Sequence, residues 1–364
     1  MKVLMLNSLD IRYGSTYRAR RLYESLLRSG LEVAYMEPNY QGNDKNVIGI
    51  KQPDSLFGYF CVVLSGIKEC LFRSYDVLVI LKTPPLSFPC ALIAKLRRKK
   101  VVIDMDDLDS ALQTKISRKI LIAFLENLVP GYADMVTTHS DYIIELLKRK
   151  KIKKIVKMAQ GVDTALFDPS RYNRQLLRQA LGLSGKKVLV YLATLTWGGC
   201  RDLDIILKAV RDLMQNKPDL FLLIVGGGPL EGHFLQIIKE LKMGNVRITG
   251  LLPQEEVPRY LSAADIALIF MRDDLGNRMR ASLKLLEYLS MEKIVVGHIV
   301  GESKDMLGQY CSLSDPTAES LTAKISDACE GKAILESARE YIKNNHSWQK
   351  IGEKMVEAMA GWGK

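Results

Sequence analysis

The chain has 364 residues, of which 48% are hydrophobic and 26% charged, and its formal net charge is +11. This composition excludes wholesale disorder, and the length suits two domains of ordinary size better than one. The six cysteines form no C-x-x-C pair and none of the four histidines lies near a cysteine, so we expect neither a disulfide framework nor a zinc site.

The N-terminal half carries most of the positive charge. Residues 1–165 contain 26 Lys and Arg and 17 Asp and Glu, a balance of +9, whereas the remainder contains 26 and 24, a balance of +2. The first residues are typical of a strand rather than of a secretory signal. The longest uncharged apolar stretch, Leu56 to Ile67, is shorter than the roughly 20 residues that span a bilayer. We therefore expect a cytoplasmic protein whose first half meets an anionic membrane surface or nucleic acid.

Apolar strands alternate with amphipathic helical stretches along both halves. The predicted strands are, in chain order, Val3–Asn7, Val33–Met36, Val77–Leu81, Val101–Asp104, Met135–Thr138, Val188–Ala193, Phe221–Val225, Val246–Thr249, Ile266–Phe270 and Ile294–Gly297. Continuous apolar runs of this kind are typical of strands buried on both faces, and their alternation with helices predicts βαβ units in parallel sheets. The fold class is therefore α/β with two Rossmann-like lobes.

The boundary between the halves is predicted near Asp168-Pro169, where a turn precedes a new set of strands. We assign residues 1–168 to the first lobe and 169–345 to the second. Residues 346–364 hold a last helix, over about Ser347–Ala360, which in two-lobed enzymes often packs back on the first lobe. Residues 40–55 are rich in turn-forming residues and are predicted to be a surface loop.

Two motifs follow predicted strands of the first half. Gly14 precedes a helix, but a lone glycine supports a dinucleotide site only weakly. Asp104-Met-Asp106-Asp107 ends a strand, where crowded carboxylates need a partner. They can bind a sugar hydroxyl, orient a nucleophile or hold a cation. In the alternative, Asp107 or Asp109 caps the next helix, and we favour a functional role for Asp106 only.

Three motifs of the second half lie where open α/β folds bind ligands. Gly226-Gly-Gly-Pro229 follows a strand and suits either a phosphate site or a tight turn alone. Arg201, in the segment that starts at Thr194, can clamp a diphosphate or be a surface arginine without a partner. Lys284 and Glu287 share one helical face. Such pairs are usually solvated, but a lysine can also bind phosphate and a carboxylate both ribose hydroxyls.

In their order and spacing, these segments resemble glycosyltransferase family 4, the retaining enzymes of the GT-B fold. The pieces are Gln160-Gly-Val-Asp163 with Phe167, Gly226-Gly-Gly-Pro229, Gly250-Leu-Leu-Pro253, Tyr260-Leu-Ser-Ala-Ala-Asp265 and Lys284-Leu-Leu-Glu287-Tyr-Leu-Ser-Met-Glu-Lys-Ile-Val-Val296. The resemblance implies an N-terminal acceptor lobe and a C-terminal donor lobe, with parallel sheets facing a central cleft. It implies transfer, with retention, from a UDP- or GDP-sugar to a glycan or lipid-linked acceptor, without a metal or other cofactor.

The resemblance also implies roles for single residues. Glu287 matches the second glutamate of the family's E-x7-E motif and would bind the donor ribose, while Arg201 and Lys284 would hold the diphosphate. Asp106 stands where many members have a histidine that touches the transferred sugar, and Met279 replaces the first glutamate of the motif. The expected catalytic residues are therefore Asp106, Arg201 and Lys284, and the expected donor-binding residues are Gly14, Thr194, Arg201, Gly227, Leu251, Lys284 and Glu287.

Three basic clusters lie in the first half, in residues 95–100, 115–119 and 148–157. Helix C-termini favour cations, which explains one such cluster more easily than three. With Leu56 to Ile67 they lead us to expect docking of the first lobe on an anionic membrane surface. Nucleic acid is not expected, because no binding motif accompanies the charge. Two alternatives remain: a non-catalytic scaffold of the same fold, favoured by Met279, and a sugar-nucleotide epimerase.

Overall fold

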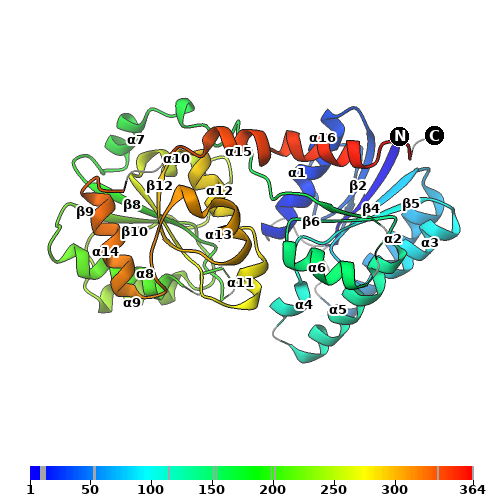
Figure 1. The fold of residues 1–364 in the computed structure, drawn as a ribbon, viewed down its shortest axis with the longest axis horizontal. Helices are drawn as coiled ribbons and strands as arrows, with labels where there is room; N and C mark the ends of the chain where they lie inside the picture. The colour runs from blue at the N-terminus through cyan, green and yellow to red at the C-terminus, as the bar shows by residue number, and fades with distance from the viewer. Residues whose placement is uncertain are drawn as a thin grey trace. The chain divides into compact units, whose positions relative to one another are not determined.

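The computed structural model describes residues 1–8, 14–51, 55–113, 115–150, 152, 154–197, 199–200, 202–333 and 336–362. The chain divides into two compact units, each built on one parallel sheet (Figure 1). The first unit comprises residues 1–161, 279–281 and 345–364, and the second comprises 162–278 and 282–344. The α/β class with two Rossmann-like lobes is thus confirmed. The sequence-based boundary after residue 168 falls inside the second unit.

The first unit contains a seven-stranded sheet in the order β3-β2-β1-β4-β5-β6-β7. Its strands are β1 (Lys2–Leu6), β2 (Glu32–Pro38), β3 (Val47–Ile50), β4 (Val77–Leu81), β5 (Lys100–Asp104), β6 (Met135–Thr138) and β7 (Ile155–Lys157). Its helices are α1 (Gly14–Arg28), α2 (Leu56–Phe72), α3 (Ser87–Leu96), α4 (Asp109–Leu112), α5 (Ile116–Leu128), α6 (Asp141–Arg149) and α16 (Trp348–Ala358), with a 3-10 turn over Val129–Tyr132.

Helices cover both faces of this sheet, so its strands are apolar on both sides. Along β1, Val3 and Met5 pack in one core cluster with α1 and α16, whereas Leu4 and Leu6 pack in another with α2, α3, α5 and α6. This is the period of two that a strand imposes on its side chains. The C-terminal helix α16 lies along α1, where the Ser25 hydroxyl donates to the Trp348 carbonyl at 2.6 Å.

The second unit contains a six-stranded sheet in the order β10-β9-β8-β11-β12-β13. Its strands are β8 (Lys187–Leu192), β9 (Leu220–Val225), β10 (Val246–Ile248), β11 (Ile266–Phe270), β12 (Ile294–His298) and β13 (Cys311–Leu313). Its helices are α7 (Arg174–Ala180), α8 (Leu203–Met214), α9 (Glu231–Glu240), α10 (Val257–Ala263), α11 (Leu275–Met279), α12 (Leu283–Ser290), α13 (Gly301–Leu307), α14 (Ala318–Cys329) and α15 (Arg339–Asn345), with 3-10 turns over Pro169–Arg171 and Gly308–Tyr310. Helices α11 and α15 end on residues of the first unit.

Three short edge strands were missed by the sequence analysis. The predicted loop over residues 40–55 is wrong at β3, which pairs with β2 from Tyr35↔Val47 to Pro38↔Ile50. The other two are β7 and β13, of three residues each. Such strands are too short for a pattern of their own and take their conformation from the neighbour they pair with. Among the described residues, no helix is long and apolar enough to cross a membrane.

Each sheet has one point where the strand order reverses, between β1 and β4 in the first unit and between β8 and β11 in the second. In open α/β sheets, ligands bind outside the carboxyl ends of the strands at such a point. The site residues expected from the sequence follow these strand ends or lie beside them.

Candidate functional site

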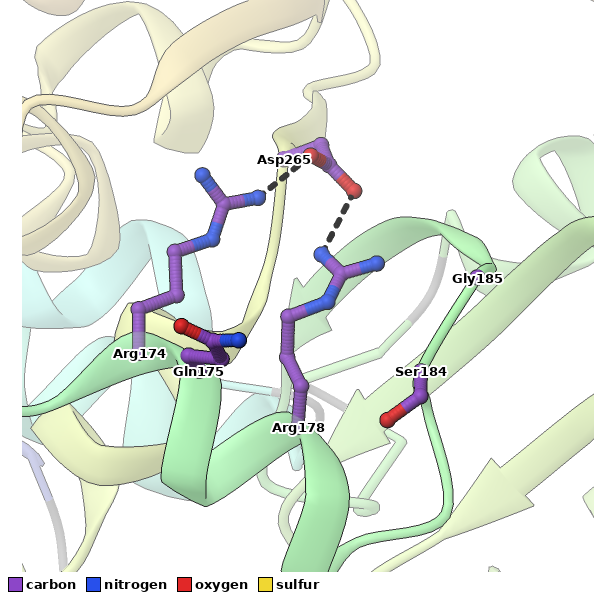
Figure 2. A pocket seen from close by; sticks show the side chains of 6 residues that line it. All are labelled: Arg174, Gln175, Arg178, Ser184, Gly185 and Asp265. Carbon is purple, nitrogen blue, oxygen red and sulfur yellow. Dashed lines mark hydrogen bonds and ion pairs between the residues drawn. The ribbon is translucent and has the colours of Figure 1, made fainter.

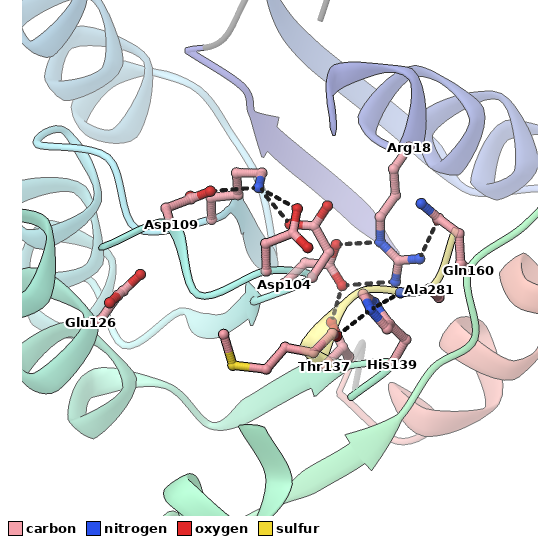
Figure 3. Close-up of polar contacts among 12 residues, drawn as sticks. Arg18, Asp104, Asp109, Glu126, Thr137, His139, Gln160 and Ala281 are labelled. Carbon is pink, nitrogen blue, oxygen red and sulfur yellow. Dashed lines mark hydrogen bonds and ion pairs between the residues drawn. The ribbon is translucent and has the colours of Figure 1, made fainter. Parts of the chain in front are cut away.

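The first polar cluster lies at the carboxyl ends of β4, β5 and β6 (Figure 3). Arg18 reaches it from α1 and pairs with Asp104 at the end of β5, with Nε at 2.8 Å from Oδ2 and Nη2 at 3.1 Å from Oδ1. The Thr137 hydroxyl donates to Oδ1 of the same carboxylate at 2.6 Å. Burial by itself would raise the pKa of Asp104, but Arg18 outweighs it and the pKa is lowered. Asp104 is therefore an ionised partner of Arg18.

Lys82, which follows β4, binds the remaining carboxylates of this edge. Its Nζ lies 3.1 Å from Asp106 Oδ1, 3.3 Å from Asp107 Oδ2 and 2.8 Å from Asp109 Oδ1. The alternative in which Asp107 or Asp109 caps a helix is wrong, because α4 has Leu108 at its N-cap and no capping side chain. Both aspartates face Lys82 instead. The sequence analysis missed Lys82, whose one local signal is its place directly after a buried apolar strand.

The pKa of Asp106 is shifted in the opposite direction to the pKa values of Asp104 and Asp107. Burial raises the pKa of Asp106 to about 7 against the opposing effect of Lys82, and the nearby Asp107 and Asp104 raise it further. Burial also acts on Asp107, but Lys82, His139 and Arg280 lower the pKa of that group. A carboxyl group that titrates near neutral pH at a strand end is a candidate for chemistry.

His139 follows β6 and contacts the segment Met279 to Ala281, which belongs to the first unit. The Ala281 amide donates to His139 Nε2 at 3.0 Å, and the Met279 carbonyl oxygen lies 3.2 Å from the same nitrogen (Figure 3). Burial lowers the pKa of His139 to about 4, so the ring is neutral at pH 7. Met279, which replaces the first glutamate of the E-x7-E motif, is buried here, and its backbone contacts His139.

In the second unit, the glycines at 226–228 let three strand-end loops pack closely. A Cβ on Gly226, which has a φ of +134°, would lie 1.9 Å from the Ala193 carbonyl oxygen. A Cβ on Gly227 would lie 2.4 Å from the Leu251 nitrogen. Packing within the protein is therefore sufficient to explain these glycines, in agreement with the alternative that this segment is only a tight turn. Thr194 and Leu251, which belong to the two loops that pack on these glycines, are exposed.

Lys284 and Glu287 project from the first turns of α12. The Lys284 ammonium lies 4.5 Å from the centre of the Tyr191 ring and 3.4 Å from its hydroxyl. Glu287 is only 5% exposed and accepts a hydrogen bond from Gln254 Nε2 at 2.7 Å. Burial raises the pKa of Glu287 to about 7, although Gln254 and Lys284 act in the opposite direction. Lys/Glu pairs on one helical face are usually solvated, but this interpretation is wrong for Glu287.

The remaining expected residues are placed as follows. Gly14 is the first residue of α1. Arg201 lies outside the described residues. Gly14 and Asp106 belong to the first unit, and Thr194, Gly227, Leu251, Lys284 and Glu287 belong to the second. Within the second unit the strand-end loops and the start of α12 bring a lysine, a buried carboxylate and close-packed glycines to one sheet. These are the groups that a phosphate and a ribose require.

A separate cavity of about 470 Å³ lies at the amino ends of the strands of the second sheet, away from the strand ends described above (Figure 2). Its wall includes Asp265, which directly precedes β11, and Arg178 of α7, whose Nη1 lies 3.1 Å from the Asp265 carboxylate. The same carboxylate accepts the Val188 amide at 2.7 Å. Asp265 and Arg178 thus hold α7 against the amino ends of two strands, and we assign this cavity no part of the ligand site.

Comparison with known proteins gives the following matches. Residues 186–330 match the family described as "Glycosyl transferases group 1". Over 212 residues the chain is 26% identical to the GDP-mannose-dependent alpha-(1-6)-phosphatidylinositol monomannoside mannosyltransferase of Mycolicibacterium smegmatis. That match covers 55% of this chain, and the chain spans about half (55%) of the relative's length.

Two solved structures align over almost the whole chain. HepE of Anabaena, in complex with UDP and glucose, has a TM-score of 0.75 at 17% identity over 99% of both chains. WaaG, a glycosyltransferase involved in lipopolysaccharide biosynthesis, has a TM-score of 0.75 at 18% identity over 99% of this chain and 100% of its own. At these identities the likeness concerns the fold.

Proposed function

The chain is a GT-B protein with a group 1 glycosyltransferase domain over residues 186–330, and from this premise we propose that it is a retaining glycosyltransferase. It moves a hexosyl group from a UDP- or GDP-sugar to a hydroxyl of a lipid-linked or glycan acceptor. One observation carries the proposal: Glu287 is buried beside Lys284 at the start of α12, next to the strand-end loops of the second sheet. A buried, weakly compensated carboxylate costs stability, which favours a functional reason for keeping it.

On the donor side, each residue has a distinct task. Glu287 accepts the ribose hydroxyls, and Lys284 places its ammonium on the diphosphate as a point charge. The Gly227 backbone contacts the nucleotide, and Leu251, which is 78% exposed, offers an apolar surface for the base. Thr194 and Arg201 complete the diphosphate contacts. The relative named above uses GDP-mannose and HepE binds UDP, so both nucleotides are candidates.

The roles of these residues in the transfer step follow from the charges that develop on the sugar and on the leaving diphosphate. As the bond to the leaving diphosphate breaks, the sugar becomes cationic and the phosphate gains negative charge. Lys284 and Arg201 stabilise the phosphate as it leaves. Asp106, when ionised, stabilises the cationic sugar. The acceptor oxygen bonds to the anomeric carbon on the face that the diphosphate leaves, and the acceptor proton passes to the departing phosphate. The configuration is thus retained without a strong protein base.

We expect no metal requirement. Carboxylates at a strand end often bind a divalent cation, but here the Lys82 ammonium already contacts Asp106, Asp107 and Asp109. Addition of a chelator is therefore expected to leave the rate unchanged. A rate that depends on Mg²⁺ or Mn²⁺ would contradict this part of the proposal.

The function is tested in two stages. Binding of UDP, GDP and their common hexose derivatives is measured by calorimetry, with wild type, Glu287→Ala and Lys284→Ala. Transfer is then followed by mass spectrometry with lipid-linked saccharides as acceptors, and the anomeric configuration of the product is read by NMR. The proposal requires one nucleotide to bind wild type and not Glu287→Ala, and a product with the anomeric configuration of the donor. An inverted product would refute retention.

The outer helices of the first unit, which is the proposed acceptor lobe, have features of a membrane-binding surface. Helices α2, α3 and α5 cover one face of the first sheet, and their outer surfaces expose large apolar side chains. The most exposed are Phe57 (76%), Phe72 (81%), Leu96 (75%), Ile116 (76%) and Ile120 (66%). On α5 these alternate with the exposed cations Arg118 and Lys119. Apolar residues interleaved with cations are typical of helices that lie in an anionic membrane interface. We propose that this face docks the protein near its lipid-linked acceptor.

Flotation with vesicles tests the membrane face. Wild type is expected to float with phosphatidylcholine vesicles that contain phosphatidylglycerol, and the double variant Ile120→Glu, Phe124→Glu is expected to stay behind. The matched control is Leu176→Glu, Leu235→Glu, which alters two exposed leucines of the second unit. Equal flotation of both double variants, or no effect of phosphatidylglycerol, would overturn the docking proposal.

One observation favours a second candidate, a non-catalytic binding subunit of the same fold. The position of the first E-x7-E glutamate is Met279, which is buried against His139 in the first unit and offers a ligand no charge. Hydrolysis of the donor in the absence of acceptor separates the two candidates. A protein that binds nucleotide but neither hydrolyses nor transfers the sugar is the binding subunit. The family match over residues 186–330 favours transfer over epimerisation.

A further inference from the structure

Lys82 is a buried charged residue to which the proposed mechanism gives no task. It follows β4 with a φ of +62°, a conformation that residues other than glycine rarely adopt. Its amide donates to the Asp104 carbonyl at 2.7 Å, which holds the backbone in this form. Strained backbone of this kind persists where the surrounding structure enforces it, and it concentrates at functional sites.

The Lys82 side chain is 5% exposed and its ammonium is shared among three carboxylates. Asp109 is the closest at 2.8 Å, followed by Asp106 at 3.1 Å and Asp107 at 3.3 Å. The ammonium donates hydrogen bonds to Asp107 and Asp109, whereas Asp106 Oδ1 lies within ion-pair distance and, buried, accepts no hydrogen bond. Burial raises the pKa of Asp106 to about 7, whereas Lys82 and other neighbouring groups together outweigh burial at Asp107, and the pKa of that group is lowered.

Stability alone explains this arrangement poorly. A buried ion cluster gains little over a well-packed apolar replacement, and one lysine among three acids leaves an excess of negative charge. The charged groups that act on Asp106 are Lys82 after β4, Asp107 and Asp104, and Arg18 on α1. Asp109 shares Lys82, and His139 and Arg280 act on the neighbouring Asp107. Arg18 is paired with Asp104, so Lys82 is the cation that directly contacts Asp106.

We infer that Lys82 is a positioning residue that holds Asp106 in place and in its ionised form for contact with the transferred sugar. The inference rests on the proposed function, in which an ionised Asp106 stabilises the cationic sugar. Removal of the ammonium leaves Asp106 between two like charges, and the cheapest response is to bind a proton. A protonated Asp106 keeps its shape but loses the charge that acts on the sugar.

A titration without substrate tests the hold of Lys82 on Asp106. The protein is labelled with ¹³C at aspartate carboxyl carbons, and the Asp106 signal is assigned by its loss in Asp106→Asn. In wild type the signal is expected to titrate near pH 7, and in Lys82→Gln at least one pH unit higher. Lys82→Arg keeps the charge and is expected to return the midpoint toward wild type. An unchanged midpoint in Lys82→Gln overturns the inference.

Kinetics then test the consequence for transfer. The acid limb of the kcat profile is expected to move up by the same interval in Lys82→Gln, with at least about a fivefold loss of kcat at pH 7 and an unchanged Kd for the nucleotide. Lys293→Gln is the matched control. Lys293 donates to the Ala264 carbonyl at the amino ends of the strands of the second sheet, away from the proposed donor site. A loss that is equal at every pH and follows a lower Tm would show a merely structural role.

If wild type neither binds nucleotide nor transfers sugar, the proposed function fails. The titration still decides whether Lys82 controls Asp106. Should Lys82→Gln not fold, Lys82→Met takes its place in the titration, because methionine keeps most of the length of the side chain without its charge. An unchanged Asp106 midpoint in folded Lys82→Met would overturn the inference.

Discussion

Replacement of Glu287 by glutamine is expected to stabilise the protein while it abolishes donor binding. Burial raises the pKa of Glu287 from its usual 4.5 to about 7, so the folded state resists ionisation of this group. The contribution of Glu287 to the free energy of unfolding is most favourable below pH 4.5, where the group is protonated in both states. This contribution is lost as the pH rises through 7. At about 1.4 kcal/mol per pH unit, the loss approaches roughly 3 kcal/mol at pH 8 and stays below about 1 kcal/mol at pH 5.

Glutamine at position 287 avoids this cost and still accepts the hydrogen bond from Gln254. For a unit of this size, about 3 kcal/mol corresponds to a rise in Tm of roughly 6–12 °C at pH 8. Calorimetric scans of wild type and Glu287→Gln at pH 5 and pH 8 measure the gap. Glu255→Gln, at an exposed glutamate of the same unit, is the control and is expected to change Tm little at either pH.

The same scans with nucleotide complete the test. UDP or GDP is expected to raise the Tm of wild type and not that of Glu287→Gln, because the neutral amide no longer accepts both ribose hydroxyls. Wild-type affinity is expected to increase as the pH rises through 7 and the carboxylate ionises. Equal Tm values for wild type and Glu287→Gln at pH 8 would refute the burial argument. Equal nucleotide stabilisation would refute the donor role.

Three further outcomes are expected. Lys284→Ala should lower kcat/KM by about 10²–10³-fold at constant Tm, the usual effect of removing one charge-stabilising donor, as steady-state kinetics will measure. Arg18→Met should cost about 3–5 kcal/mol in urea unfolding at pH 7, because Asp104 stays buried and unpaired, and the cost should shrink as the pH falls and Asp104 takes up a proton. Gly227→Ala should cost about 1–3 kcal/mol or more, since its Cβ would lie 2.4 Å from the Leu251 nitrogen; an unchanged Tm would refute the packing argument.

The sequence determined the layers of the fold. Every strand predicted from an apolar run coincides with a strand of the structure, because strands buried on both faces must be apolar throughout. It also indicated Lys284 and Glu287, which are three residues apart on one helix, since local spacing alone brings them to one face. The spacing of the two residues does not indicate whether that face of the helix is exposed to solvent. The burial of Glu287 depends on packing around α12.

Only the tertiary structure decided the partners of the acidic cluster. Lys82 precedes Asp106 by more than twenty residues, and nothing in its own neighbourhood identifies a partner. The two meet because β4 and β5 pair in parallel, with Leu81 opposite Asp104, so that the residues after both strands leave the sheet at one edge. Strand order and register are properties of the whole sheet. A local pattern can predict that a strand exists, but it does not contain the identity of the strand beside it.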